Sequence, residues 1–232
     1  NSIKDLEILN FSARNIDMSI LNKFIYFCLI LLTFGCSKTV EEGSTLKGDK
    51  IEIEMITAYR DGIEAFNQQN FLKAAKKFNE AELLFPQSEW APKASLMAAY
   101  AFYIDGYYDD AIFQLDQFIK TYPKNSKISY ANYLEAMSYY NKIVDEKKDL
   151  NPLIKSKKKF QYIVKTYPES DFALDSSFKL DLIDDRLARK ELFIARHYLK
   201  SKKWIPAINR FKKIIKKYDQ TIYVEEALHR LV

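Results

Sequence analysis

Small and large apolar residues recur at fixed distances in four segments between residues 50 and 232. We count each segment back from a reference position, which is a proline in the first three segments and Asp219 in the fourth. Twelve positions earlier the residue is small, and eight positions earlier it is large and apolar. The small residues are Ala74, Ala111, Ser156 and Ala207, and the large ones are Phe78, Leu115, Phe160 and Phe211. Because residues four apart lie on one face of a helix, the pattern predicts helices whose neighbours approach closely at the small residue.

The ends of these helices are also marked. An aromatic residue directly precedes each reference position: Phe85, Tyr122, Tyr167 and Tyr218. The residue before a proline disfavours the α region, so the aromatic–proline pair predicts the end of a helix. Ser88 and Ser170 stand two residues after their prolines, where each is expected to cap the next helix. Each segment is therefore predicted to be a helical hairpin, with a large residue near the start of its second helix: Phe71, Tyr108, Leu153 or Trp204.

The repeats are irregular in two places. The reference positions are 37, 45 and 51 residues apart. A polar insertion, NKIVDEKKDLNP over residues 141–152, lengthens the third hairpin. No glycine or proline occurs between Ser170 and Lys203, which predicts one long helix over residues 171–200, about 45 Å in length. Residues 222–232 are predicted to be the first helix of a fifth hairpin. Because a terminal repeat needs a polar capping face, we expect the solenoid to continue or another chain to cover this end.

The amino-terminal part has a different character. The apolar run over residues 24–34 is eleven residues long, whereas a membrane-spanning helix needs about 20. Lys23 precedes the run, so residues 18–35 are predicted to be a cleaved secretory signal and residues 1–17 to be upstream sequence without a role in the fold. Residues 36–49 begin with Cys36, continue as a polar stretch with two glycines, and are predicted to be a flexible tether. The solenoid is expected to occupy residues 50–232.

Composition argues against several functional classes. The formal net charge of +5 is too small to indicate nucleic acid as a partner. The two cysteines, Cys28 and Cys36, both lie at the apolar run, so no disulfide or thiolate metal site is expected in the repeats. His197 and His229 lack any ligand or nucleophile pattern around them. We therefore expect no catalytic residues, no metal and no cofactor, although a carboxylate pair among the helices stays open as an enzymatic alternative.

The hairpin pattern resembles the tetratricopeptide repeat, on the strength of Gly106-x-Tyr108-x-x-Ala111 and the terminal prolines. Gly35-Cys36 resembles the end of a bacterial lipoprotein signal, although Thr33 stands where that family usually has leucine. Three further features are similar to the BamD family of outer-membrane-protein assembly lipoproteins. They are the polar insertion, the stretch SYANYL over residues 129–134, and DRLA over residues 185–188 followed by WIPAINRF over residues 204–211.

The resemblance implies a function and sites. Cys36 would be the acylated residue, and Ser37 after it favours the outer membrane, so the protein would be anchored at the periplasmic face of a Gram-negative outer membrane. It would bind the POTRA domains of a BamA-type insertase, and other assembly-complex subunits, and help to receive unfolded β-barrel precursors. Arg186 matches the basic residue that contacts POTRA domains in that family, with Asp185 and Arg189 beside it. The alternative for these three is a solvated helix face with Asp–Arg pairs.

A groove along the first two or three repeats is the candidate site for an extended, aromatic-rich precursor peptide. The residues expected to line it are Tyr59, Arg60, Phe66, Tyr100 and Tyr103. The alternative is that most of them pack between helices. Lys212 and Lys213 precede Lys216 and Lys217 by four residues, which sets like charges against each other. An acidic partner or anionic lipid headgroups would offset that repulsion, and simple solvation is the alternative.

A second functional hypothesis stays open at this point. The same anchored solenoid would serve as an adaptor for a secretin, for the Tol–Pal system or for cell-wall synthesis. The irregular third and fourth hairpins favour the assembly factor.

Overall fold

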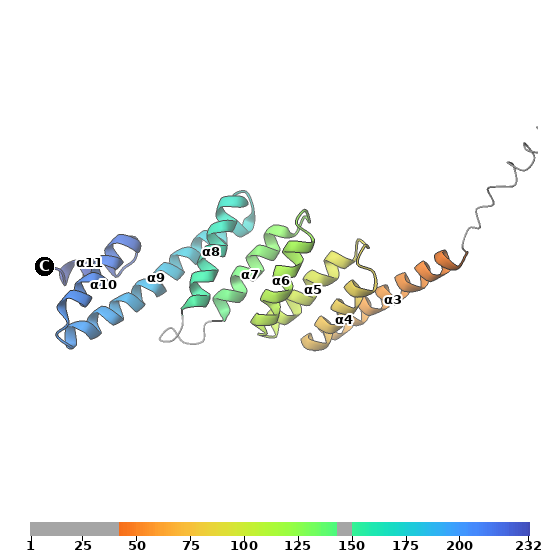
Figure 1. Ribbon diagram of the computed structural model, residues 1–232, viewed down its shortest axis with the longest axis horizontal. Helices are drawn as coiled ribbons and strands as arrows, with labels where there is room; N and C mark the ends of the chain where they lie inside the picture. The colour runs from red at the N-terminus through yellow and green to blue at the C-terminus, as the bar shows by residue number, and fades with distance from the viewer. Residues whose placement is uncertain (1–41, 143–149) are drawn as a thin grey trace, which may run out of the picture. The chain divides into compact units, whose positions relative to one another are not determined.

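The computed structural model describes residues 42–142 and 150–232, which form a row of helices (Figure 1). The description below concerns this part of the chain, most of which forms one compact unit from residue 48 onward. Its helices are α3 (Glu42–Asn67), α4 (Phe71–Leu84), α5 (Ala91–Ile104), α6 (Tyr108–Thr121), α7 (Ile128–Asn141), α8 (Asn151–Thr166), α9 (Asp171–Lys200), α10 (Trp204–Lys217) and α11 (Val224–His229).

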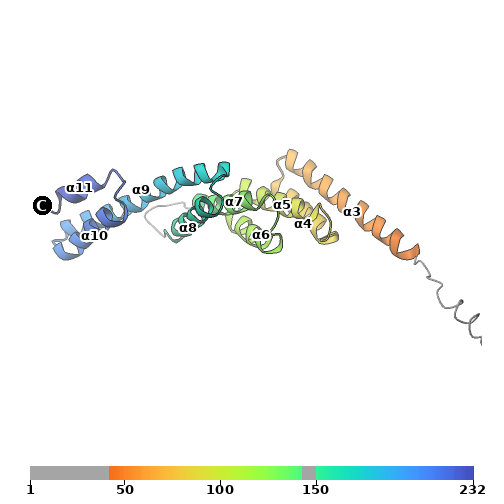
Figure 2. The same ribbon diagram turned by 90° about the horizontal axis from the view of Figure 1, so that it is seen from above.

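The helices form the predicted hairpins. Successive helices from α4 to α11 pack against one another, and α5 also contacts α7, as α7 contacts α9. Seen from above, α4, α6, α8 and α10 lie along one side, while α5, α7 and α9 lie along the other (Figure 2). The second helices of the four hairpins therefore form one layer and the first helices form another. This all-α solenoid with one 30-residue helix in its fourth hairpin confirms the predicted fold class.

The core is built from the repeated columns. All four small residues and all four large residues of the pattern have no exposed surface. Ser156 is tolerated among the alanines because its hydroxyl donates a hydrogen bond of 2.9 Å to the carbonyl oxygen of Ala136. The aromatic residues before the reference positions stand directly after the last residues of α4, α6, α8 and α10, as expected. Spacing alone therefore located the buried face of each second helix.

The two serine caps behave differently from each other. The Ser88 hydroxyl oxygen accepts a hydrogen bond of 3.1 Å from the Ala91 amide at the start of α5, as predicted. Ser170 is the residue before α9, but its hydroxyl donates to the carbonyl oxygen of Tyr167 at 2.7 Å and does not cap the helix. The prediction of a side-chain cap at Ser170 was wrong, because the hydroxyl closes the preceding turn instead.

Two boundaries differ from the predictions. α3 begins at Glu42, so residues 42–49 are helical and not the flexible tether that their composition suggested. Once a helix is fixed by packing, each added residue gains a backbone hydrogen bond, and a glycine such as Gly48 costs only about 1 kcal/mol. The last helix, expected over residues 222–232, is limited to Val224–His229. The signal, Cys36 and most of the insertion lie outside the described residues.

The turns inside three hairpins share one backbone form. Gln69, Gly106 and Lys202 have positive φ angles of 60°, 80° and 58°, each two residues before the second helix begins. This left-handed conformation favours glycine, yet only the second hairpin has glycine there. The turn between α9 and α10 therefore has Lys202 in a left-handed conformation that glycine adopts more easily.

Candidate functional site

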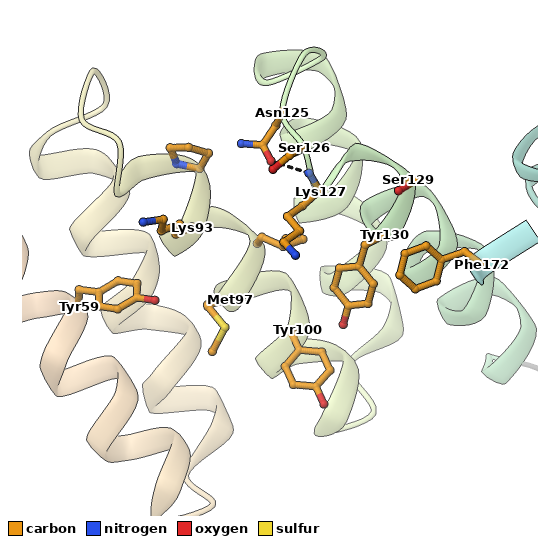
Figure 3. Close-up of a pocket in the computed structure, with 12 residues that line it drawn as sticks. Tyr59, Lys93, Met97, Tyr100, Asn125, Ser126, Lys127, Ser129, Tyr130 and Phe172 are labelled. Atoms are coloured by element: carbon orange, nitrogen blue, oxygen red, sulfur yellow. Dashed lines mark hydrogen bonds between the residues drawn. The ribbon is translucent and has the colours of Figure 1, made fainter. Parts of the chain in front are cut away.

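A groove lies across the first helices of the hairpins. It encloses about 530 Å³ and is lined from α3, α5, the turn over residues 125–127, α7 and the start of α9. Figure 3 shows Tyr59, Met97, Tyr100 and Tyr130 around this space, with Phe172 next to Tyr130. Its volume lies within the range typical of ligand sites, about 300–1,000 Å³. The groove is large enough for several side chains of a bound segment.

An aromatic row continues from the groove. The rings of Phe66 and Tyr100 stack with their centroids 5.8 Å apart, and those of Tyr100 and Tyr103 stack at 6.5 Å. Tyr103 also contacts Tyr108 at 5.9 Å and accepts a hydrogen bond of 2.9 Å from the Asn141 amide. Stacked rings hold one another in fixed positions, so the wall of the groove is preorganised.

Two tyrosines of the groove, Tyr59 and Tyr130, stay uncharged. Burial raises the pKa of Tyr130 to about 12, and it also raises the pKa of Tyr59. Their hydroxyl groups can therefore donate and accept hydrogen bonds at neutral pH, but they add no charge. The charge of the groove comes from Lys93 and Lys127, both exposed. Neither lysine forms an ion pair within residues 42–142 and 150–232, and the Lys93 ammonium lies 4.7 Å from the centre of the Trp90 ring.

The five residues predicted for the groove separate into three groups. Tyr59 and Tyr100 line it. Phe66 and Tyr103 lie in the aromatic row behind Tyr100 and do not line the cavity. Arg60 is exposed on α3 but is not part of the lining either. Tyr59 lines the groove and Arg60 does not because consecutive residues of a helix point about 100° apart.

Other groove residues were missed by the sequence patterns. Lys93, Met97 and Tyr100 lie on one face of α5, four and three residues apart, a spacing that could have been read from the sequence. Phe172 could not have been found that way. It comes from the start of the long helix and reaches the groove only because α9 packs beside α7.

The second predicted site lies in the middle of α9. The Arg186 guanidinium stands 4.6 Å from the centre of the Tyr140 ring on α7, and the Lys179 ammonium stands 5.6 Å from the same ring. The Nε of Arg189 donates a hydrogen bond of 2.9 Å to the hydroxyl of Tyr223, just before α11. Asp185, directly before Arg186 in the sequence, is half-buried. These contacts fix the directions of both arginines and link the middle of α9 to helices on either side.

Two kinds of site are absent from the part of the chain that the structure describes. None of its helices is both long enough and apolar enough to span a membrane. It contains no group of three or more His, Cys, Asp or Glu side chains arranged to hold a metal ion.

Fold and surfaces together define a tetratricopeptide-type binding protein, a solenoid of helical hairpins with a groove on its first helices. Comparison with known proteins assigns the chain to a narrower class than the fold does. A family model described as "YfiO: Outer membrane lipoprotein" matches residues 52–232. The chain therefore belongs to this family of outer membrane lipoproteins, to which the BamD resemblance pointed.

Several curated relatives carry the name "Outer membrane protein assembly factor BamD". The protein of Rickettsia prowazekii is 40% identical over 176 residues, which cover 76% of this chain and 70% of the relative. That of Caulobacter vibrioides is 35% identical over 198 residues, covering 85% and 64%. That of Neisseria meningitidis serogroup B is 32% identical over 180 residues, covering 73% and 67%. The chain thus spans about two thirds of the length of these relatives.

Proposed function

We propose that this protein is an assembly factor for outer membrane β-barrel proteins and acts as a binding scaffold. The shared family, together with relatives named for this role, supports the proposal. The observation that carries it is that one solenoid presents two separate candidate surfaces: an aromatic groove on the first helices and arginines held in place on α9. A scaffold needs at least two such surfaces, since it must hold two partners at once.

In this proposal, Cys36 carries the lipid that anchors the chain at the periplasmic face of the outer membrane. The α9 face, with Asp185, Arg186 and Arg189, contacts the POTRA domains of a BamA-type insertase. The contact between Arg186 and Tyr140 supports this role, because a guanidinium already fixed over a ring loses less conformational freedom on binding.

A pull-down of the insertase from solubilised outer membranes tests this surface. Arg186→Glu is expected to weaken capture at least tenfold, since reversing a charge at an interface introduces both an unpaired charge and repulsion. Arg186→Lys keeps the charge over Tyr140 and should retain part of the binding. Lys165→Glu, an equal charge reversal at an exposed position on α8, is the control. Unchanged capture by Arg186→Glu would exclude this face, and recovery of cell-wall enzymes alone would favour the adaptor hypothesis.

The groove is proposed to hold an extended segment of an unfolded barrel precursor. Its aromatic wall suits the aromatic residues of a β-strand, and Lys93 and Lys127 suit a carboxylate on the same segment. The probe is a synthetic peptide with the sequence of the last strand of a barrel protein, and the readout is its dissociation constant.

Tyr100→Ala should weaken the peptide at least tenfold, because it removes a ring from the groove and from the aromatic row. Phe113→Ala removes a ring that is 64% exposed on α6, outside the groove, and should leave affinity unchanged. Equal effects of both substitutions would mean that the peptide binds exposed aromatic surface without using the groove.

A further inference from the structure

The turn between the two helices of the fourth hairpin has an unusual surface. We call residues 200–206, Lys-Ser-Lys-Lys-Trp-Ile-Pro, the α9–α10 corner. All seven are exposed. Trp204 is 59% exposed and Ile205 is 74% exposed, and Ile208 extends the apolar surface one turn along α10 at 38%. A tryptophan and two isoleucines thus lie in water beside three lysines.

The charge around the corner has a single sign. Residues 192–218 contain nine lysines and arginines but no aspartate or glutamate. Three of these cations are engaged elsewhere, since Arg196 pairs with Glu226 while Arg210 and Lys213 pair with Glu191. Lys200, Lys202, Lys203 and Lys212 form no ion pair within the described residues. The positive charge of the corner is therefore not neutralised by any carboxylate among the described residues.

Comparison with the other hairpins shows that the fold does not require this surface. Phe71 and Tyr108 occupy the place of Trp204 in the first and second hairpins. Their rings pack against Phe66 and Tyr103, at 5.1 and 5.9 Å between centroids. No ring contact of Trp204 occurs among the described residues. The aromatic residue at this position packs against another ring in two hairpins and is exposed to solvent in the fourth.

The backbone conformation of the turn does not require lysines either. Asn70 and Lys203 precede their helices with nearly the same angles, φ −90° and ψ 70° against φ −95° and ψ 80°. Asn70 caps α4 by accepting a hydrogen bond of 3.2 Å from the Lys73 amide, whereas Lys203 makes no side-chain cap. Lys202 occupies the left-handed position that Gln69 and Gly106 fill elsewhere. Uncharged residues thus suit both positions, so the lysines call for another explanation.

We propose that the α9–α10 corner docks onto a membrane surface that carries anionic phospholipid headgroups. Tryptophan and isoleucine would enter the interfacial layer, while the lysine stems lie along the apolar boundary and keep their charges among the phosphates. A lipid surface fits better than a protein, because protein interfaces are depleted in lysine and prefer arginine. Basic clusters at membranes, in contrast, gain affinity from each lysine. A chain of an outer membrane lipoprotein family works next to such a surface.

This docking contact goes beyond the scaffold role and does not depend on Arg186 or on the groove. It would add a second membrane contact, far along the chain from Cys36. Two attachment points hold a protein at a surface much more firmly than one, because the second contact forms at a high effective concentration.

Tryptophan fluorescence tests the contact directly, because the chain contains only two tryptophans, Trp90 and Trp204. The full chain is bound to vesicles of phosphatidylglycerol and phosphatidylcholine, with or without brominated acyl chains. In the Trp90→Phe variant, Trp204 should be quenched by the brominated lipid and its emission should shift to the blue. In the Trp204→Phe variant, Trp90 should show neither effect. Trp204 emission that is the same with and without bromine would overturn the proposal.

A graft from the first hairpin tests the charges without disturbing the turn. Lys202→Gln with Lys203→Asn gives the α9–α10 turn the residues of Gln69 and Asn70, which already occupy this backbone form. Affinity for the phosphatidylglycerol vesicles should fall about thirtyfold at physiological salt, since each lysine near an anionic surface contributes about 1 kcal/mol. Vesicles of phosphatidylcholine alone should bind weakly and equally to both proteins.

The matched control removes two lysines from the other end of the same helix. Lys216→Gln with Lys217→Gln changes the net charge equally, about 20 Å away along α10 and beyond the screening length at physiological salt. Its affinity should stay unchanged. An equal loss in both double variants would mean general electrostatic attraction and contradict docking by the corner. If the emission of Trp204 shifts to the blue when the insertase is added without any lipid, and does not shift with vesicles alone, the corner binds a protein partner. That result would also overturn the proposal.

Discussion

Gly62 in α3 shows how a single missing side chain sets the distance between two helices. A Cβ atom at this position would stand 2.8 Å from two ring carbons of Phe78, which has no exposed surface. The ring is held by Tyr59 at 5.3 Å between centroids and by the alanines of its cluster, so it cannot move aside easily. The first hairpin thus depends on a glycine that the repeated columns do not reveal.

We predict that Gly62→Ala destabilises the protein. Overpacking a filled core costs about 1–3 kcal/mol, which outweighs the gain of about 1 kcal/mol from replacing glycine in a helix. Urea unfolding monitored by circular dichroism would measure the difference. Gly48→Ala in the same helix is the control, because nothing lies within 4 Å of the added atom, and it should be neutral or stabilising. A stabilising Gly62→Ala would mean that α3 and α4 can separate freely at this point.

At the scale of single elements, α11 is short and relies on an ion cluster. Glu226 accepts hydrogen bonds from the Nε of Arg196 on α9 at 2.9 Å and from the Nε of Arg230 at 2.7 Å. The hydrogen bond from Arg196 is the main reason that the pKa of Glu226 is lowered to about 2, and Arg230 lowers it further. A six-residue helix has little stability of its own, so these bonds hold it against α9.

The pH dependence of this element follows from that pKa. Because the folded state lowers the pKa, the ionised carboxylate stabilises the fold above about pH 4.5, and this contribution disappears as the pH falls toward 2. Glu226→Gln should therefore lower the free energy of unfolding by about 1 kcal/mol at neutral pH, after allowing for screening by water. Near pH 2 the variant and the parent should be equally stable.

Urea unfolding at several pH values measures both effects. Glu225→Gln removes a neighbouring exposed carboxylate and serves as the control. A difference that stays constant from neutral to acidic pH would show that Glu226 acts through packing and not through its charge.

At the scale of the whole repeat unit, each helix contacts mainly its neighbours in sequence. The buried clusters follow the same rule, since the cluster around Phe78 and the cluster around Phe211 share no residue. Stability in such a solenoid is a sum of local terms, so damage at one end need not spread to the other.

We therefore predict that Phe78→Ala and Phe211→Ala act on different parts of the molecule. Both remove a fully buried ring from the same column of the repeat, at a cost of about 3–5 kcal/mol. Hydrogen exchange should show lost amide protection in α3–α5 for the first variant and in α9–α11 for the second. Each variant serves as the control for the other. Equal loss along all the described helices in either variant would mean that the repeats unfold as one cooperative unit.

The sequence alone determined the repeat architecture, because the chemistry that specifies a helical hairpin is local. Small and large residues four apart define a packing face, and an aromatic–proline pair ends a helix. The long helix over residues 171–200 followed from the absence of breakers, and the structure gives the same bounds. The start of α3 at Glu42 did not follow, because a tolerated glycine is a weak signal against a helix whose length is set by packing.

Tertiary structure alone decided which side chains share a surface. Tyr59 and Tyr100 join Phe172 in one groove although they lie far apart in the sequence, since stacking brings α3, α5, α7 and α9 together on one side. Arg186 meets Tyr140, and Trp204 turns outward where Phe71 and Tyr108 turn inward. Periodicity is a property of one helix, whereas exposure depends on which neighbour covers the face. The sequence therefore predicted the hairpins, and only their packing decided where the chain can bind a partner.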